Sequence, residues 1–234
     1  MKKRCLNYTV VKSLITFLLL VHFLSASTFV KAKVQLPSIL SSNMVLQQHT
    51  NVKLWGKAQK NSPITIKTSW DNKTYKTIAD KQGKWLLNIS TPVAGGPYEI
   101  TFNDGELLTL KNILIGEVWF CSGQSNMEMP MSGFDRQPTQ GTNDVIAKAK
   151  ASTPIRIYNT DSKDGKWIRQ FSKTPEEDCK GEWLENTPVN VSHTSATAYF
   201  FAQYLQEVLE VPVGIIISSL GGSKVEAWMS REAI

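Results

Sequence analysis

The feature that most constrains the fold is a change in hydrophobic pattern near residue 112. Before that point, short runs of alternating apolar and polar residues recur between turn signals rich in Gly, Pro and Asn. The runs are Val52–Trp55, Ile64–Thr68, Trp85–Ile89 and Tyr98–Phe102. Period-two alternation in runs of this length predicts a small antiparallel β-sandwich over residues 33–112.

After Lys111 the apolar runs lengthen and alternate with helical patterns. Ile113–Phe120 is a nearly continuous apolar run, and Pro154–Tyr158 and Val213–Ser218 are further predicted strands. Thr142 is expected to cap a short helix that extends to about Ala151. A second, amphipathic helix has apolar positions at Ala198, Phe201, Ala202, Leu205, Val208 and Leu209 and is stopped by Pro212. Strands alternating with helices predict a parallel sheet, so residues 113–234 indicate an α/β domain.

The first 32 residues have the pattern of an export signal. A basic start at Met1–Arg4 leads into the apolar run Leu14–Val21, and small residues at Ser25–Ser27 and Val30–Ala32 offer cleavage points. The apolar core is too short for a membrane span, which needs about 20 residues. We therefore expect residues 1–32 to be removed and the protein to be exported. Its expected location is periplasmic or extracellular, or a lysosome-like compartment in a eukaryote, without stable membrane association.

The positive charge of the chain is concentrated in this signal. The formal net charge is +6, from 26 basic and 20 acidic residues, and five of the basic residues but no acidic one lie in residues 1–32. Without the signal the two signs nearly balance. Nucleic-acid binding therefore loses its main support.

Cysteine usage and spacing argue against a disulfide scaffold and against a metal site. Only Cys121 and Cys179 remain beyond the signal, too few for a disulfide-stapled fold. Cys121 ends an apolar run and is expected to be buried rather than to act as a thiol nucleophile. No Cys-x-x-Cys, His-Glu-x-x-His or acidic calcium loop occurs, so no metal or other cofactor is expected.

Two of the predicted parallel strands end in sequences suited to catalysis. One continues into Ser122–Asn126 and the other into Ser219–Ser223, which contains a Gly-Gly pair. Ligands bind at the carboxyl ends of parallel strands. A Gly-x-Ser turn can present a serine hydroxyl there, and a Gly-Gly turn lets backbone N–H groups approach an oxyanion. Together they predict half of an acyl-transfer site, although either motif alone can be an ordinary turn or a helix cap.

The segment Gly116–Pro130 closely resembles the first signature of the sialate O-acetylesterase family, within the SGNH hydrolase class. Further resemblance to that family lies in Met44–Gln47 with Val52–Gly56, in Ser195–Phe201 and in Val211–Trp228. The resemblance implies a β-sandwich followed by the first part of an SGNH-type three-layer α/β/α domain with a parallel sheet. It also implies metal-free hydrolysis of O-acetyl esters of sialic acid, with an acetylated sugar or glycan as substrate.

The resemblance assigns roles to individual residues. It implies that Ser125 is the nucleophile and that the N–H groups of Ser125 and Gly222 hold the oxyanion, with Gly221 the less favoured donor. The structural alternatives are a helix N-cap for Ser125 and a tight left-handed turn for Gly222. Ser223 stands where relatives often carry Thr, which should preserve the turn.

The chain departs from the family pattern in its general base. The family's His, preceded three positions earlier by an Asp, and a signature Asn both lie near the far end of the catalytic domain, and neither occurs before Ile234. We therefore interpret the chain as the N-terminal part of a longer enzyme, with little or no activity alone. Of the histidines, His49 lies in the β region, and only His193 is a realistic substitute, although Asn190 rather than Asp precedes it.

Two other functions stay open. One is a related esterase acting on acetylated plant polysaccharide, and the other is a non-catalytic glycan-binding module that uses Trp55, Trp70 and Trp85 as a sugar-stacking platform. Packing inside the sandwich is the simpler interpretation of these tryptophans.

Three residues near the two predicted loops have an ambiguous role. Glu128 and Glu226 either contact sugar hydroxyls or are solvated carboxylates. Trp228 either walls the acyl pocket or packs at the start of a helix.

Overall fold

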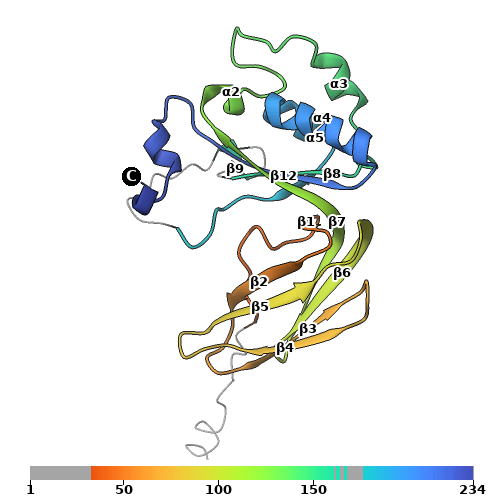
Figure 1. The fold of residues 1–234 in the computed structure, drawn as a ribbon, viewed down its shortest axis with the longest axis vertical. Helices are drawn as coiled ribbons and strands as arrows, with labels where there is room; N and C mark the ends of the chain where they lie inside the picture. Colours follow the sequence, from red (N-terminus) through yellow and green to blue (C-terminus); the bar gives the residue numbers. More distant parts are fainter. Residues whose placement is uncertain (1–32, 161, 164–165, 168–175, 234) are drawn as a thin grey trace, which may run out of the picture. The chain divides into compact units, whose positions relative to one another are not determined.

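The computed structural model describes residues 33–160, 162–163, 166–167 and 176–233, so the predicted signal lies outside the described residues. A mixed eight-stranded sheet with a few helices forms the core of the fold (Figure 1). Its strand order is β11-β8-β12-β7-β6-β3-β4, with β1 also paired to β7. No helix among the described residues is long and apolar enough to span a membrane. The strands are β1 (Val45–Gln47), β2 (Asn51–Lys57), β3 (Pro63–Thr68), β4 (Thr74–Ile78), β5 (Lys84–Ser90), β6 (Gly95–Asn103), β7 (Leu107–Gly123), β8 (Ile155–Asn159), β9 (Ser162–Lys163), β10 (Lys166–Trp167), β11 (Trp183–Glu185) and β12 (Val213–Ser219).

The long strand β7 belongs to both regions that the sequence distinguishes. Its first half pairs with β6 in antiparallel register, from Asn103 opposite Leu107 onward. Its second half pairs with β12 in parallel, and β1 runs parallel to its middle. β7 therefore continues through the expected boundary at residue 112, and Ile113–Phe120 is the central part of a longer strand (Figure 1).

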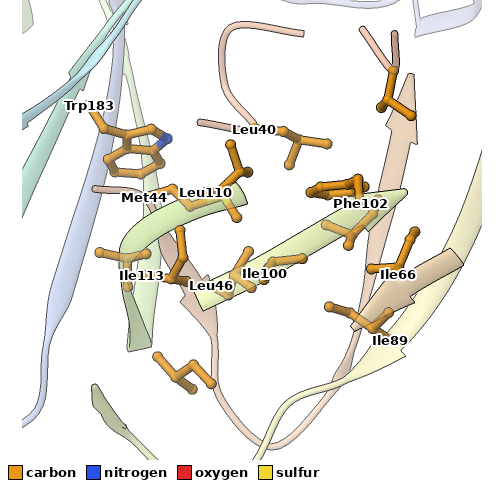
Figure 2. Packing of buried hydrophobic residues seen from close by; sticks show 14 of the residues in the cluster. Leu40, Met44, Leu46, Ile66, Ile89, Ile100, Phe102, Leu110, Ile113 and Trp183 are labelled. Carbon is orange, nitrogen blue, oxygen red and sulfur yellow. The ribbon is translucent and has the colours of Figure 1, made fainter. Parts of the chain in front are cut away.

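The four strands predicted in the β region are all present. β3 and β6 pair within the large sheet, whereas β2 and β5 form a separate two-stranded antiparallel sheet. Side chains from both groups share one buried cluster, in which Ile89 of β5 lies near Ile66 of β3 and Phe102 of β6 (Figure 2). Burial of alternate apolar residues is the main stabilising contribution of this region.

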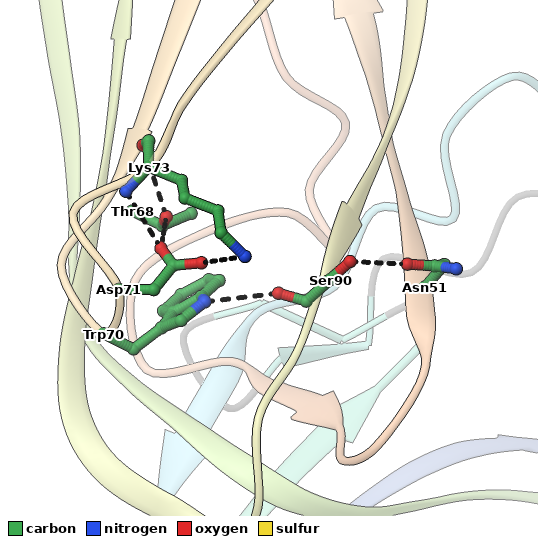
Figure 3. Close-up of polar contacts among 6 residues, drawn as sticks. All are labelled: Asn51, Thr68, Trp70, Asp71, Lys73 and Ser90. Atoms are coloured by element: carbon green, nitrogen blue, oxygen red, sulfur yellow. Dashed lines mark hydrogen bonds and ion pairs between the residues drawn. The ribbon is translucent and has the colours of Figure 1, made fainter.

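Trp70 joins the β3–β4 turn to β5. Its indole N–H donates to the carbonyl oxygen of Ser90 at 3.2 Å, and the ring packs edge-on against Tyr98 (Figure 3). Next to it, Asp71 accepts hydrogen bonds from the Thr68 hydroxyl at 2.5 Å and from the Lys73 backbone N–H at 3.0 Å. These contacts explain why Trp70 is partly buried and tie the turn to the neighbouring sheet.

The parallel pairing predicted for the second region is confirmed. β12 lies between β7 and β8 and is parallel to both. The sheet is nevertheless mixed rather than purely parallel, because β11 runs antiparallel to β8 and β6 antiparallel to β7. β11 was not predicted because it is only three residues long and lies in a polar stretch of sequence.

All helices of the described residues are short except α5, which has 14 residues. They are α2 (Ser125–Glu128), α3 (Asn143–Lys148), α4 (Pro188–Ser192) and α5 (Ala196–Leu209), followed by the 3-10 helices η1 (Val225–Trp228) and η2 (Arg231–Ala233). α3 ends at Lys148 rather than near Ala151. α5 ends before Glu210, which adopts a left-handed conformation two residues ahead of Pro212.

The predicted apolar face of α5 was partly wrong. Ala198, Tyr199 and Ala202 are buried, whereas Val208 and Leu209 are exposed and Phe201 keeps 38% of its surface accessible. The small alanine side chains let the helix approach the sheet closely. The Tyr199 hydroxyl donates to Asn186 Oδ1 at 2.9 Å, so the Tyr199 side chain is part of the buried face.

Candidate active site

The two loops that the sequence singles out lie side by side. β7 and β12 pair to their carboxyl ends, with Ser219 opposite Gly123. Just beyond, the Leu220 N–H donates to the Gly123 carbonyl oxygen at 3.0 Å. The parallel pairing therefore delivers the Gly-x-Ser and Gly-Gly segments to the same edge of the sheet.

Ser125 is the first residue of α2 and is exposed to solvent. The N-cap position belongs to Gln124, so Ser125 does not cap the helix as the structural alternative required. Within the described residues, its hydroxyl makes no hydrogen bond to another side chain or to the backbone. The hydroxyl is thus accessible to a molecule arriving from solvent.

Gly221 lies directly beside Ser125. A Cβ atom built on Gly221 would be 3.7 Å from Ser125 Cβ and 2.5 Å from Glu128 Oε2, so a side chain there would meet the Glu128 carboxylate. Gly222, the next residue, has a φ of +74° and is exposed, and a Cβ atom there would meet nothing within 4 Å. The diglycine turn is therefore close to Ser125 and open on the side of Gly222.

Two side chains that flank Ser125 in sequence hold this turn. The Glu128 carboxylate accepts a hydrogen bond from the Gly221 N–H, and the Gln124 side-chain amide donates to the Ser223 carbonyl oxygen. Because the Gly221 N–H is engaged by Glu128, Gly222 stays the candidate for the oxyanion donor.

Sequence reasoning missed the role of these two residues. Gln124 was not considered, and Glu128 was interpreted as a sugar contact or a solvated carboxylate. It is in fact half-buried against the turn. Their positions one residue before and three residues after Ser125 place them on either side of it, which is the only sequence signal of their role.

Ser223 and Trp228 stabilise the same turn from the other side. The Ser223 hydroxyl donates to the Leu220 carbonyl oxygen at 2.7 Å and accepts from the Trp228 indole N–H at 2.9 Å. Trp228 thus packs within η1 against the turn, in keeping with its packing role, while Glu226 of the same helix is exposed.

Cys121 lies four residues before Ser125 but inside the fold, with 8% of its surface accessible. Burial raises the pKa of its thiol, which keeps it protonated and weakly nucleophilic. The prediction that Cys121 is buried is confirmed. It is not paired with Cys179, whose Sγ lies 3.5 Å from the Tyr158 hydroxyl.

The structure does not bring a histidine to Ser125. His193 follows α4 and is exposed, and no hydrogen bond joins it to Ser125 among the residues that the structure describes. His49 is exposed between β1 and β2. The described residues also hold no cluster of three or more His, Cys, Asp or Glu side chains suited to a metal.

The sequence of the chain is similar to those of known enzymes. No protein-family model matches the chain. It is 26% identical over 212 residues to the sialate O-acetylesterase of Mus musculus, and 27% identical over 217 residues to that of Rattus norvegicus. Each alignment covers 84% of this chain and 38% of the relative. The chain therefore spans a little over a third of the length of these curated relatives.

A solved structure shows the same fold. The crystal structure of a carbohydrate acetylesterase from Xanthomonas citri superposes with a TM-score of 0.76 and 31% sequence identity. The match covers 86% of this chain and 44% of that chain.

Proposed function

We propose that the chain is related to the sialate O-acetylesterases and that it carries the nucleophile and oxyanion donors of an esterase acting on O-acetylated sugars. The observation that carries the proposal is the exposed Ser125 hydroxyl beside the Gly221–Gly222 turn. We also propose that residues 33–112 are a β-sandwich and that residues 113–234 belong to an SGNH-type domain.

In the proposed reaction, Ser125 Oγ attacks the carbonyl carbon of the acetyl ester and gives up its proton to a base. The carbonyl oxygen becomes an oxyanion that accepts hydrogen bonds from the N–H groups of Ser125 and Gly222. The bond between the carbonyl carbon and the sugar oxygen then breaks, and the sugar oxygen takes a proton. Water hydrolyses the acetyl-serine to acetate and regenerates Ser125.

The rate that we expect for this chain depends on whether a general base can accept the proton of the Ser125 hydroxyl. The sequence contains no Asp-x-x-His, and His193 is exposed and not hydrogen-bonded to Ser125 within the described residues. An oxyanion hole and substrate binding without a complete triad give an acceleration of about 10³–10⁴ over water. We therefore propose that this chain alone is a slow esterase, several orders of magnitude below an enzyme with a base in place.

For the sugar, we propose sialic acid, since the curated relatives are named sialate O-acetylesterases. Acetylated plant polysaccharide is the alternative, supported by the broader name of the Xanthomonas citri enzyme. Acetate release from O-acetylated sialic acid and from acetylated xylan, measured side by side, distinguishes the two.

The serine assignment is tested by hydrolysis of p-nitrophenyl acetate by the wild-type chain and by Ser125→Ala. We expect slow hydrolysis above the buffer rate and a lower rate in Ser125→Ala, because the variant loses the part of the reaction that passes through the serine hydroxyl and keeps only what the oxyanion donors and substrate binding supply. Ser132→Ala is the matched control, because Ser132 is an exposed serine on the following loop, and it should keep the wild-type rate. Equal rates for the wild-type chain and Ser125→Ala would refute the assignment.

A further inference from the structure

A cavity of about 550 Å³ opens on the β region, away from the residues of the Ser125 site. It lies within the range of about 300–1,000 Å³ typical of small-molecule sites. Its lining comes from four parts of the chain: the segment before β1, the strands β2 and β5, the β4–β5 turn with Asp80, and the segment that contains Glu177.

The cavity contains an exposed apolar strip formed by Trp55 and Leu86. These residues are direct cross-strand partners in the β2–β5 sheet, with 38% and 57% of their surfaces accessible. Their sequence neighbours Leu54 and Trp85 are buried in the core, so alternation places the indole of Trp55 on the opposite, outer face. Leu36 and Pro37 add apolar surface to the lining.

Polar groups surround this strip, and their charges are compensated. Lys57 and Lys84 are also cross-strand partners, and both bind Glu177, at 2.6 Å and 2.9 Å. Hydrogen bonds from Lys57 and Lys84 lower the pKa of Glu177 to about 2, so its carboxylate is charged at any ordinary pH. The Glu177 carboxylate thereby separates two ammonium groups that would otherwise repel each other.

The other two carboxylates of the lining are held by the protein itself. Asp178 accepts from the Ser38 N–H and hydroxyl, at 2.9 Å and 2.7 Å. Asp80 accepts the backbone N–H groups of Gln82 and Lys84, both at 2.8 Å. The lining therefore has no strong excess of either sign, and it does not favour a highly charged ligand.

From this combination we infer that the cavity is a binding site for a neutral saccharide unit. A sugar ring has an apolar C–H face and a rim of hydroxyl groups. Trp55 and Leu86 provide a surface for the apolar face, and the ammonium and carboxylate groups of Lys57, Lys84 and Glu177 can bind the hydroxyls. The inference does not depend on catalysis at Ser125, because the two sites share no residue.

Of the three tryptophans considered as an alternative sugar platform, Trp55 alone fits this role. Trp85 is 4% accessible and belongs mainly to the core, and Trp70 is held by Ser90 and does not line the cavity (Figure 3). The site is therefore a single-ring platform with a polar rim rather than a row of three aromatic rings.

The test is a titration of the whole chain with xylohexaose and with cellohexaose. Binding is detected by isothermal titration calorimetry and by changes in the indole N–H signals of NMR spectra. Colominic acid, a polymer of anionic sugars, serves as the charged probe. We expect at least one neutral hexasaccharide to bind and to shift the Trp55 indole signal. Trp55→Ala should weaken binding by about tenfold or more, and Trp55→Phe by less.

Two variants serve as controls. Trp119→Ala removes a tryptophan of similar exposure outside the cavity, and Ser125→Ala removes the proposed nucleophile; both should bind as the wild-type chain does. Absence of binding by both neutral probes, equal affinity of Trp55→Ala and the wild-type chain, or preference for colominic acid would each overturn the inference.

Discussion

The carboxylate of Glu128 accepts the backbone N–H of Gly221, and this contact joins the helix that begins with Ser125 to the turn that follows β12. A hydrogen bond to a charged acceptor is about twice as strong as one between neutral groups. Since Gln124 binds Ser223 in the same turn, the two side chains hold the diglycine turn, with its proposed oxyanion donor, in place relative to Ser125. The candidate site is thus built by residues that flank the proposed nucleophile in sequence.

Removing the Glu128 carboxylate should loosen the turn. We expect Glu128→Ala to increase hydrogen exchange of the Gly221 N–H by about tenfold or more, because its acceptor is lost. Glu128→Gln keeps an acceptor oxygen and should restore much of the protection. NMR-detected exchange measures both, with Glu226→Ala on the exposed face of η1 as the control. Unchanged protection in Glu128→Ala would contradict the role of this contact.

Substitution of Gly222, which has a left-handed backbone conformation, can distinguish an effect on stability from an effect on catalysis when a second glycine of the same conformation is substituted for comparison. Gly222→Ala and Gly141→Ala both introduce a Cβ atom into open space at a φ near +75°, with values of +74° and +76°. Each should lower the free energy of unfolding by about 1 kcal/mol, measured by urea denaturation.

Of the two variants, only Gly222→Ala should also lower the rate at which Ser125 is acetylated, since residue 222 is a proposed oxyanion donor and residue 141 is not. Gly141 lies just before α3 and serves as the matched control. Equal acetylation rates in the two variants would argue against Gly222 as a donor.

Asp71 should make stability depend on pH. Burial opposes its charge, but hydrogen bonds from Thr68 and Lys73 outweigh that effect and lower the pKa below its ordinary value of 3.8. A lowered pKa stabilises the fold above the unfolded-state pKa, and this stability is lost as the pH falls through the folded-state value.

Asp71→Asn should therefore lower the free energy of unfolding by about 1 kcal/mol at pH 7, and the difference from the wild-type chain should shrink below pH 4. Urea denaturation across this pH range measures the effect. Asp135→Asn, at an almost fully exposed carboxylate, should have none. A difference between Asp71→Asn and the wild-type chain that persists at low pH would show that the carboxylate charge is not responsible.

The two thiols should differ in reactivity. Cys121 is buried with a raised pKa, whereas Cys179 is only half-buried. We expect iodoacetamide at pH 7 to modify Cys121 slowly in the folded chain and rapidly after denaturation, with Cys179 reacting faster in the folded state. Peptide mapping by mass spectrometry distinguishes the two modified cysteines. Fast modification of Cys121 in the folded chain would favour Cys121 as a thiol nucleophile.

The sequence predicts the elements of this fold better than their connections. Alternation within β2, β3, β5 and β6 and the apolar run of β12 identify those strands, because burial on one or both faces sets their residue types. The continuity of β7 through residue 112 is not visible, since its first residues alternate between exposed and buried whereas residues 113–116 are buried on both faces, which gives two different patterns.

For the site, the Gly-x-Ser and Gly-Gly motifs predict which loops matter, and the parallel register of β7 and β12 brings them together. The contact of Glu128 with Gly221 depends on the precise approach of two loops 93 residues apart, which no local pattern encodes. The buried face of α5 was predicted only in part. Ala198 and Ala202 are buried as expected, but the hydrogen-bonded Tyr199 is buried beside them in place of Val208 and Leu209, which are exposed.

The most direct test of the central claim is to trap the acyl intermediate. The chain is mixed with p-nitrophenyl acetate, stopped with acid within a single turnover and mapped by mass spectrometry. We expect one acetyl group on the peptide that contains Ser125, absent in Ser125→Ala and formed more slowly in Gly222→Ala. Acetyl groups distributed over lysines and other serines, with residue 125 unmodified, would contradict it.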